Sequence, residues 1–272
     1  MRQRANWPAA IFAGLWLAII MIPVYVMVRA GFSSREDYGN SGPIGMPNAF
    51  TLENFRYTMD SGFGKYLLNS GILTVGTVIL VLLMVPPLAY VIVRGRSRWI
   101  PTVFKAMLFG LAIPAQVVVI PLYFIIVKVG LYDSLLGVIF PSVAFVIPLT
   151  TLILTSTMRE INNELYEAMA LDGAGSVRTF LTLVLPLSKG GIATIVVFSA
   201  LQTWNNYLLP LTLTRSEDVR VATLGLGIFK QQFALNVPGL MSAVMLTIVP
   251  ILLIYIFARR SLERGLMGVG GK

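Results

Sequence analysis

The sequence predicts an all-α integral membrane protein with six transmembrane helices and a helix-turn-helix segment between the fourth and fifth spans. Three observations predict this class. Of the 272 residues, 56% are hydrophobic and 12% are charged, whereas about 25% of residues in soluble domains are charged. The mean hydropathy is +0.80. Apolar runs of about 20 residues, long enough to span a bilayer, recur along the chain, and its charged residues fall between them or near their ends.

The apolar runs divide the chain into spans and loops. They cover Pro8–Val28, Leu67–Val93, Pro101–Val127, Leu135–Ser156, Gly190–Leu211 and Leu240–Ala258. A cleaved signal peptide is the alternative for the first run, but its length exceeds the usual apolar core of roughly 7–15 residues, so we expect a retained helix. Three parts follow: a first helix with its external loop (1–66), a five-helix core (67–260) with an inserted segment (157–189), and a C-terminal tail (261–272).

The placement of basic residues orients the spans. An even number of spans puts both termini on one side of the membrane, and most Lys and Arg residues fall on that side. The short loop Arg94–Arg98 carries three arginines and no acid, and basic residues in short loops favour the cytoplasmic side. We therefore expect a multi-pass protein with cytoplasmic N- and C-termini and a cytoplasmic tail.

The residue inventory leaves little standard catalytic chemistry. The chain has no cysteine and no histidine, which excludes disulfides, thiolate metal sites and catalysis by either side chain. Gly64-Lys65 lacks an upstream glycine and is followed by Tyr66, so it is not a P-loop. The basic residues form no dense patch for nucleic acid. We expect a non-catalytic protein that itself binds no metal, cofactor or nucleic acid.

The segment Thr157–Lys189 is too long for a simple turn, and its pattern predicts order. Within Ile161–Leu171, Asn162 or Asn163 can cap a short helix. Acidic residues occupy its first turns and apolar residues share one face: Glu164 and Glu167, then Leu165, Ala168 and Leu171.

Asp172-Gly173 is predicted to end this helix, because glycine readily adopts the positive φ of a helix C-cap. Ser176 can cap a second short helix that ends before Pro186. The two helices form a helix-turn-helix at the cytoplasmic surface. It rests on the bilayer interface or docks in a groove of a partner protein.

One motif in this segment resembles a known family. Glu167-Ala168-Met169-Ala170-Leu171-Asp172-Gly173-Ala174, followed by Leu185-Pro186, resembles the EAA loop of binding-protein-dependent ABC importer permeases, with Met169 in place of a second alanine. The resemblance implies a coupling helix that seats in a cleft of a cytoplasmic ATPase. It assigns this role to Glu164, Glu167, Ala168, Asp172, Gly173, Ala174, Phe180 and Pro186.

Further segments resemble the carbohydrate branch, in the manner of the smaller membrane subunit of the maltose transporter. They are Phe50–Phe55, Asn69-Ser70, Ile113-Pro114 through Tyr123, Gly130–Tyr132, Trp204-Asn205 and the tail Arg264–Leu266. The resemblance implies a permease subunit that imports a sugar or oligosaccharide across the bacterial cytoplasmic (inner) membrane. It implies as partners a second homologous permease subunit, two copies of an ATPase subunit that holds ATP and Mg, and an extracytoplasmic solute-binding protein.

The predicted spans contain uncharged polar and aromatic side chains that suit a hydroxyl-rich solute. The candidates for a substrate path are Gln116, Gln202, Thr203, Trp204, Asn205 and Tyr207. Helix–helix hydrogen bonds are the alternative for the polar residues, and interfacial anchoring is the alternative for the aromatic ones.

Two further interpretations concern ion coupling and the external face. A secondary, ion-coupled carrier is the alternative function, but such carriers usually hold ionisable groups in the membrane, and we find none in these spans. The external segment Thr212–Gly239 is either a surface for the solute-binding protein or a solvated loop.

Overall fold

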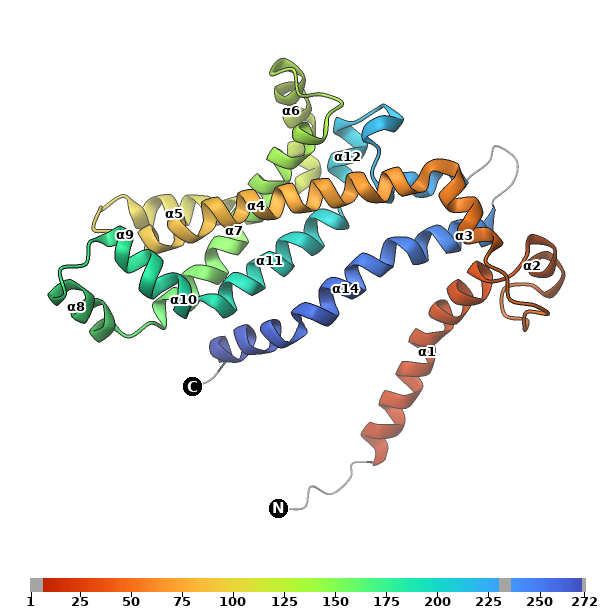
Figure 1. Cartoon of the computed structure of the whole chain (residues 1–272), viewed down its shortest axis with the longest axis horizontal. Coiled ribbons are helices and arrows are strands. Elements are labelled where there is room, and N and C mark those ends of the chain that lie inside the picture. The colour runs from red at the N-terminus through yellow and green to blue at the C-terminus, as the bar shows by residue number, and fades with distance from the viewer. Residues whose placement is uncertain (1–6, 230–235, 271–272) are drawn as a thin grey trace. The chain divides into compact units, whose positions relative to one another are not determined.

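The computed structural model describes residues 7–229 and 236–270, with the backbone alone for 257–270. The regular elements within these residues are helices (Figure 1). They form two compact units: residues 1–64 with 225–249, and residues 65–224 with 250–272.

The first unit is built on the apolar helix α1 (Trp7–Gly31), whose buried residues all lie at its C-terminal end. It also contains α2 (Arg35–Ser41), α3 (Glu53–Thr58), the π-helical turn η1 (Met59–Phe63), the 3-10 turn η5 (Leu226–Phe229) and the start of α14 (Val237–Gly270). The Asn54 side-chain amide donates to the carbonyl oxygens of Gly31 and Ser33 at 2.9 and 2.7 Å. The hydroxyls of Thr58 and Ser242 are 2.7 Å apart.

The core of the second unit lies among three long helices: α4 (Gly64–Arg94), α7 (Leu135–Arg159) and α11 (Lys189–Trp204). Its buried residues include Val81, Val85, Val138, Leu154 and Ile195, each 0% exposed. The start of α11 lies against the end of α7, where a Cβ atom on Gly191 would come within 2.6 Å of the Thr157 hydroxyl oxygen. The two helices are therefore antiparallel and closely packed at this point.

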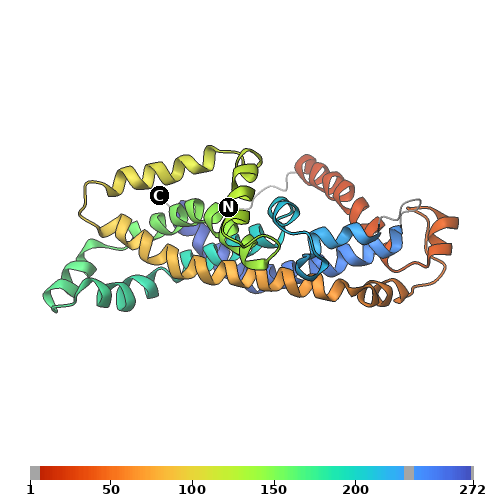
Figure 2. The same cartoon turned by 90° about the horizontal axis from the view of Figure 1, so that it is seen from above.

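The third predicted span is broken rather than continuous. It consists of α5 (Ile100–Phe109) with the 3-10 turn η2 (Gly110–Ala112), followed by α6 (Ala115–Lys128), and these two parts meet at 106°. Figure 2 shows the sharp turn. Ile113 is extended, with φ −88° and ψ 117°, because a proline disfavours the helical conformation of the preceding residue. Pro114 therefore ends the helix that the sequence predicts through Pro101–Val127.

The fifth predicted span is also interrupted. α11 ends at Trp204, Asn205 and Asn206 leave the helix, and α12 (Leu208–Leu213) follows. The 3-10 turn η4 (Glu217–Val219) and α13 (Ala222–Gly225) come next. α14 extends to Gly270, beyond the predicted span end at Ala258. Of the expected tail (261–272), residues 271–272 lie outside the described part of the chain.

Within residues 7–229 and 236–270, four helices are long and apolar enough to cross a membrane. The count rises to the predicted six if each of two bent pairs is taken as one span. The pairs are α5–η2 with α6, and the run Ser176–Leu187 with α11, which meet at 106° and 76°.

Candidate functional site

The EAA segment, defined here as residues 160–188, begins with a capped helix, α8 (Asn163–Leu171). The Asn162 side chain accepts a hydrogen bond from the backbone N–H of Glu164 at 3.2 Å, which satisfies one free donor of the first turn. Glu164 places negative charge at this end, where the helix dipole favours it. Of the two predicted caps, Asn162 and Asn163, the structure confirms Asn162.

The C-terminus of α8 is a Schellman motif. The N–H of Ala174 donates to the Met169 carbonyl oxygen at 2.9 Å, and that of Gly173 donates to Ala170 at 3.1 Å. Gly173 has a φ of +73°, a conformation that costs a residue with a Cβ atom roughly 1–2 kcal/mol. The predicted helix end at Asp172-Gly173 is confirmed.

The second helical run differs from the prediction. It comprises α9 (Ser176–Thr179), the π-helical turn η3 (Phe180–Val184) and α10 (Leu185–Leu187). Its N-cap residue is Gly175, which makes no side-chain cap, so the predicted cap at Ser176 is wrong. The run also continues through Pro186. The wider turn η3 precedes the proline, and such turns accommodate interruptions of the regular hydrogen-bond ladder.

The residues expected to couple to an ATPase mostly lie at the surface of this segment. Phe180 and Ala174 are half-buried, and the others are exposed: Glu164, Glu167, Ala168, Asp172, Gly173 and Pro186. Large apolar side chains are exposed beside them, with Leu171 at 89%, Val177 at 72% and Leu181 at 54%. Exposed apolar groups that cluster with polar neighbours are typical of protein interaction sites.

The side chain that anchors α8 is Tyr166, which sequence reasoning did not single out. It is 7% exposed, and the Arg94 guanidinium lies 4.0 Å from its ring centroid. Burial raises the pKa of the Tyr166 phenol, although Arg94 acts in the opposite direction. Its hydroxyl is buried and has no hydrogen-bond partner among the described residues. Tyr166 is the one aromatic residue in the sequence of α8, and this is the signal that could have indicated the anchor.

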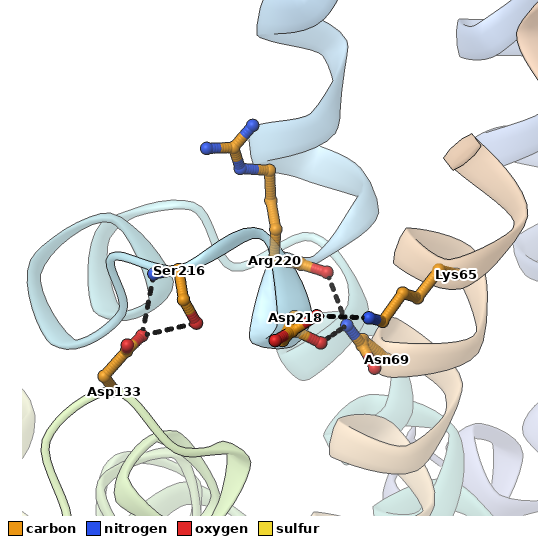
Figure 3. Close-up of polar contacts among 6 residues, drawn as sticks. All are labelled: Lys65, Asn69, Asp133, Ser216, Asp218 and Arg220. Carbon is orange, nitrogen blue, oxygen red and sulfur yellow. Dashed lines mark hydrogen bonds and ion pairs between the residues drawn. The ribbon is translucent and has the colours of Figure 1, made fainter. Parts of the chain in front are cut away.

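At the other end of α4, two sets of hydrogen bonds hold the α12–α13 loop, residues 214–221 (Figure 3). The Asn69 side-chain amide donates to the carbonyl oxygens of Asp218 and Arg220, both at 2.8 Å. The Ser70 hydroxyl accepts from the N–H of Ala222 at 2.9 Å. Lys65 forms an exposed ion pair with Asp218, which adds little stability in water.

Asp133, in the turn between α6 and α7, holds the same loop from a second side. Its Oδ1 accepts from the backbone N–H groups of Arg215 and Ser216 at 2.8 and 2.9 Å, and from the Ser216 hydroxyl at 3.2 Å. These hydrogen bonds, led by that of Arg215, lower the pKa of Asp133. Asp133 has a φ of +58°, a conformation that Asp tolerates better than most residues.

A cavity of about 540 Å³ lies within the second unit, between η2, α6, α7, α11 and α12. Its lining is mostly apolar and includes Leu122 and Phe145. Its polar lining residues are Ser142, Gln202, Thr203 and Asn206, and no charged residue lines it. Thr203 is 2% exposed, and its hydroxyl has no hydrogen-bond partner among the described residues. A buried hydroxyl without a described partner therefore lies on a residue of the cavity wall.

The candidate path residues are only partly brought together. Gln202 and Thr203 line the cavity, whereas Gln116, Trp204, Asn205 and Tyr207 do not. Gln116 and Tyr207 are exposed and Trp204 is buried. The Asn205 side-chain amide donates to the carbonyl oxygen of Leu201, in the last turn of α11, at 2.9 Å. Among the described residues, no group of three or more acidic side chains could hold a metal ion.

Residues 86–268 match the family described as binding-protein-dependent transport system inner membrane component. The chain belongs to this family of ABC importer permeases. The diacetylchitobiose uptake system permease protein NgcG of Streptomyces coelicolor is 34% identical to this permease over 90% of the chain and 82% of the relative. The glucose import system permease protein GlcU of Saccharolobus solfataricus is 29% identical over 96% and 92% of the two chains.

The fold of this permease also matches a solved structure. A chain in the crystal structure of a bacterial ABC transporter involved in the import of the acidic polysaccharide alginate superimposes with a TM-score of 0.82. The match covers 96% of the permease and 99% of that chain at 19% identity. At this identity, the likeness shows the fold. The matched family region includes both the EAA segment and the cavity.

Proposed function

We propose that this permease imports a sugar or oligosaccharide, with ATP hydrolysed on partner subunits. Its relatives NgcG and GlcU are named for the uptake of diacetylchitobiose and glucose. The cavity supports a carbohydrate, because its polar lining is uncharged and can exchange hydrogen bonds with hydroxyl groups. In this proposal, the sugar passes the cavity at Gln202 and Thr203.

The EAA segment is the proposed docking site for the ATPase. The observation that carries this assignment is a helix with defined caps, anchored from within by Tyr166, whose outer residues Glu167 and Leu171 remain exposed. Glu167 supplies a charge-assisted contact, and Leu171 supplies apolar area.

The proposed complex contains a second homologous permease and two copies of the ATPase, which hold ATP and Mg. In this proposal, the EAA segment and both termini lie in the cytoplasm.

The α12–α13 loop is the proposed contact for an extracytoplasmic solute-binding protein. Arg215, Glu217 and Asp218 are exposed, while Asp133 and Asn69 fix the backbone that carries them. A loop held in this way loses little conformational entropy when a partner binds.

Gly173→Asp tests the ATPase docking site, with Gly130→Asp as the matched control. Both glycines have a φ of +73°, and a Cβ atom at either would meet nothing within 4 Å of this chain. Both substitutions therefore impose the same backbone strain and the same charge, but only Gly173 lies on the proposed docking surface. We expect Gly173→Asp to reduce ATP-driven uptake of labelled sugar at least about tenfold, a typical coupling loss, and Gly130→Asp to reduce it far less.

The readout is uptake of labelled diacetylchitobiose and glucose by proteoliposomes that contain the purified complex and its solute-binding protein. Equal loss for both variants would assign the effect to backbone strain. Normal uptake by Gly173→Asp would contradict docking through this segment.

A further inference from the structure

Both helical runs of the EAA segment contact the last turns of the same helix, α4. The Arg94 guanidinium stacks on Tyr166 at 4.0 Å, and its Nη1 donates to the Asn163 side-chain oxygen at 2.9 Å. One turn earlier, the ring of Tyr90 lies 5.3 Å from that of Phe180. α8 and η3 are therefore attached to α4 at two separate points.

The chemistry of the Arg94 contact makes it directional. A guanidinium is planar, so it can stack on a ring and donate in its own plane at the same time, which an ammonium cannot do. Tyr166 presents a fixed ring face, because burial in the core restricts the side chain. Arg94 is the last residue of α4, where its positive charge also interacts favourably with the negative, C-terminal end of the helix dipole.

The other end of α4 is attached to the α12–α13 loop through Asn69 and Ser70. Asn69 and Arg94 are separated by 25 residues of continuous helix, or about 38 Å at 1.5 Å per residue, which exceeds the roughly 30 Å of a bilayer core. A displacement of α8 that is transferred to Arg94 therefore reaches the opposite side of the membrane through a single helix.

We propose that Arg94 and Tyr166 are positioning residues that make α4 move together with the EAA segment. This proposal rests on the proposed ATPase docking, and it names the contact through which movement of α8 reaches α4. Phe180 and Tyr90 form a second contact between the segment and α4. Without the Arg94 stack, the ATPase still binds and turns over, but α8 displaces α4 less, because its own contact is lost and the Phe180–Tyr90 contact remains.

The purified complex with its solute-binding protein, reconstituted in proteoliposomes, allows a test. The variants are Arg94→Ala, Arg94→Lys, Tyr166→Leu and Tyr166→Phe, and Arg96→Ala is the matched control. Arg96 is exposed in the loop that follows α4, and none of the hydrogen bonds, ion pairs and ring contacts among the described residues joins it to the EAA segment. Three quantities are measured: the amount of ATPase that co-purifies, the rate of ATP hydrolysis, and the uptake of labelled diacetylchitobiose and glucose.

We expect Arg94→Ala and Tyr166→Leu to retain the ATPase while the ATP hydrolysed per sugar imported rises at least about fivefold, the lower end of typical allosteric coupling. Arg94→Lys keeps the charge but not the planar stack, so its ratio is expected to lie between wild type and Arg94→Ala. Tyr166→Phe keeps the ring and loses a hydroxyl without a described partner, so it should retain at least half of the uptake. The double variant Arg94→Ala/Tyr166→Leu should be no worse than either single variant, because both remove one contact.

The outcomes separate this inference from the proposed function. Absence of any ATPase from the wild-type complex would contradict the docking proposal itself. An ATPase that binds the Arg94→Ala complex with an unchanged ratio of hydrolysis to uptake would overturn the Arg94 link alone. Loss of the ATPase from that variant would show that Arg94 maintains the docking surface, which would also overturn the link. A ratio raised equally by Arg96→Ala would assign the effect to loop charge.

Discussion

At the scale of single residues, a substitution of Thr203 distinguishes a structural role of this side chain from contact with the solute. Thr203 lines the cavity, and its hydroxyl is buried and has no partner among the described residues. Valine has nearly the same shape, and removal of an unpartnered polar group is nearly neutral for stability. Thr203→Val should therefore leave the folded complex intact but lower sugar uptake roughly three- to tenfold, the value of one hydrogen bond.

Thr151→Val is the control for Thr203→Val. Thr151 is 0% exposed, and its hydroxyl also lacks a described partner, but it does not line the cavity. Uptake kinetics in proteoliposomes would distinguish the two variants. Equal uptake by both would place the sugar path away from Thr203.

Asp133 is one of the residues that order the α12–α13 loop. Asp133→Ala removes the acceptor and places alanine at a φ of +58°, whereas Asp133→Asn keeps an acceptor and tolerates this conformation. Trypsin added outside right-side-out membrane vesicles should cleave after Arg215 or Arg220 roughly tenfold faster in Asp133→Ala than in wild type, since ordered backbone resists proteolysis. Asp133→Asn should lie nearer to wild type. Cleavage from the cytoplasmic face alone would reverse the proposed orientation.

The Asp133 contacts also predict a dependence on pH. Its folded-state pKa is lowered by the N–H groups of Arg215 and Ser216, so its contribution is fully present above the ordinary pKa of about 3.9 and is lost as pH falls through the lowered value. The difference in Tm between wild type and Asp133→Asn in detergent should thus stay constant from about pH 8 to about pH 5. A difference that disappears between about pH 8 and about pH 6 would assign the stabilisation to another group.

At the scale of elements, α7 and α11 pack closely against each other where they join the two ends of the EAA segment. A Cβ atom on Gly191 would meet three atoms of Thr157 at 2.6, 2.9 and 3.0 Å, and Thr157 is β-branched and stiff at χ1. Gly191→Ala should destabilise the complex by about 1–3 kcal/mol, the usual cost of overpacking. In contrast, Gly71→Ala in α4, where a Cβ atom would meet nothing within 4 Å, should be neutral or stabilising.

Thermal unfolding of the detergent-solubilised complex checks this pair of variants. A Tm for Gly191→Ala that equals that of Gly71→Ala would show that α7 and α11 separate freely at Thr157.

Local signals predicted the elements well where the cause was local. Asn162 and Gly173 set the limits of α8, because a cap depends on residues within one turn. The break at Ile113 also has a local cause, the following Pro114. The third span was nevertheless predicted to be continuous, because the apolar run extends across this proline. Ser176 failed as a cap because its position within the helix, and not its chemistry, decides the role.

At the scale of the whole molecule, the fold class and the family could be predicted, whereas the anchoring contacts could not. Apolar periodicity indicates that a helix meets a membrane or core, but it does not identify the partner helix. In the sequence, the positive charge of Arg94 indicates only on which side of the membrane its loop lies. In the structure, Arg94 stacks on Tyr166, which is 72 residues further along the chain. The cavity likewise joins Gln202 and Thr203 to Ser142, on a different helix.

The most direct test of the account is the composition and activity of the complex that purifies through a tag on this permease. We predict a second homologous permease and two copies of an ATPase, with uptake of labelled sugar that requires ATP and the solute-binding protein, and with weaker ATPase retention or uncoupling in Glu167→Ala. A permease that purifies alone and drives sugar uptake from an ion gradient without ATP would contradict the account in favour of a secondary carrier.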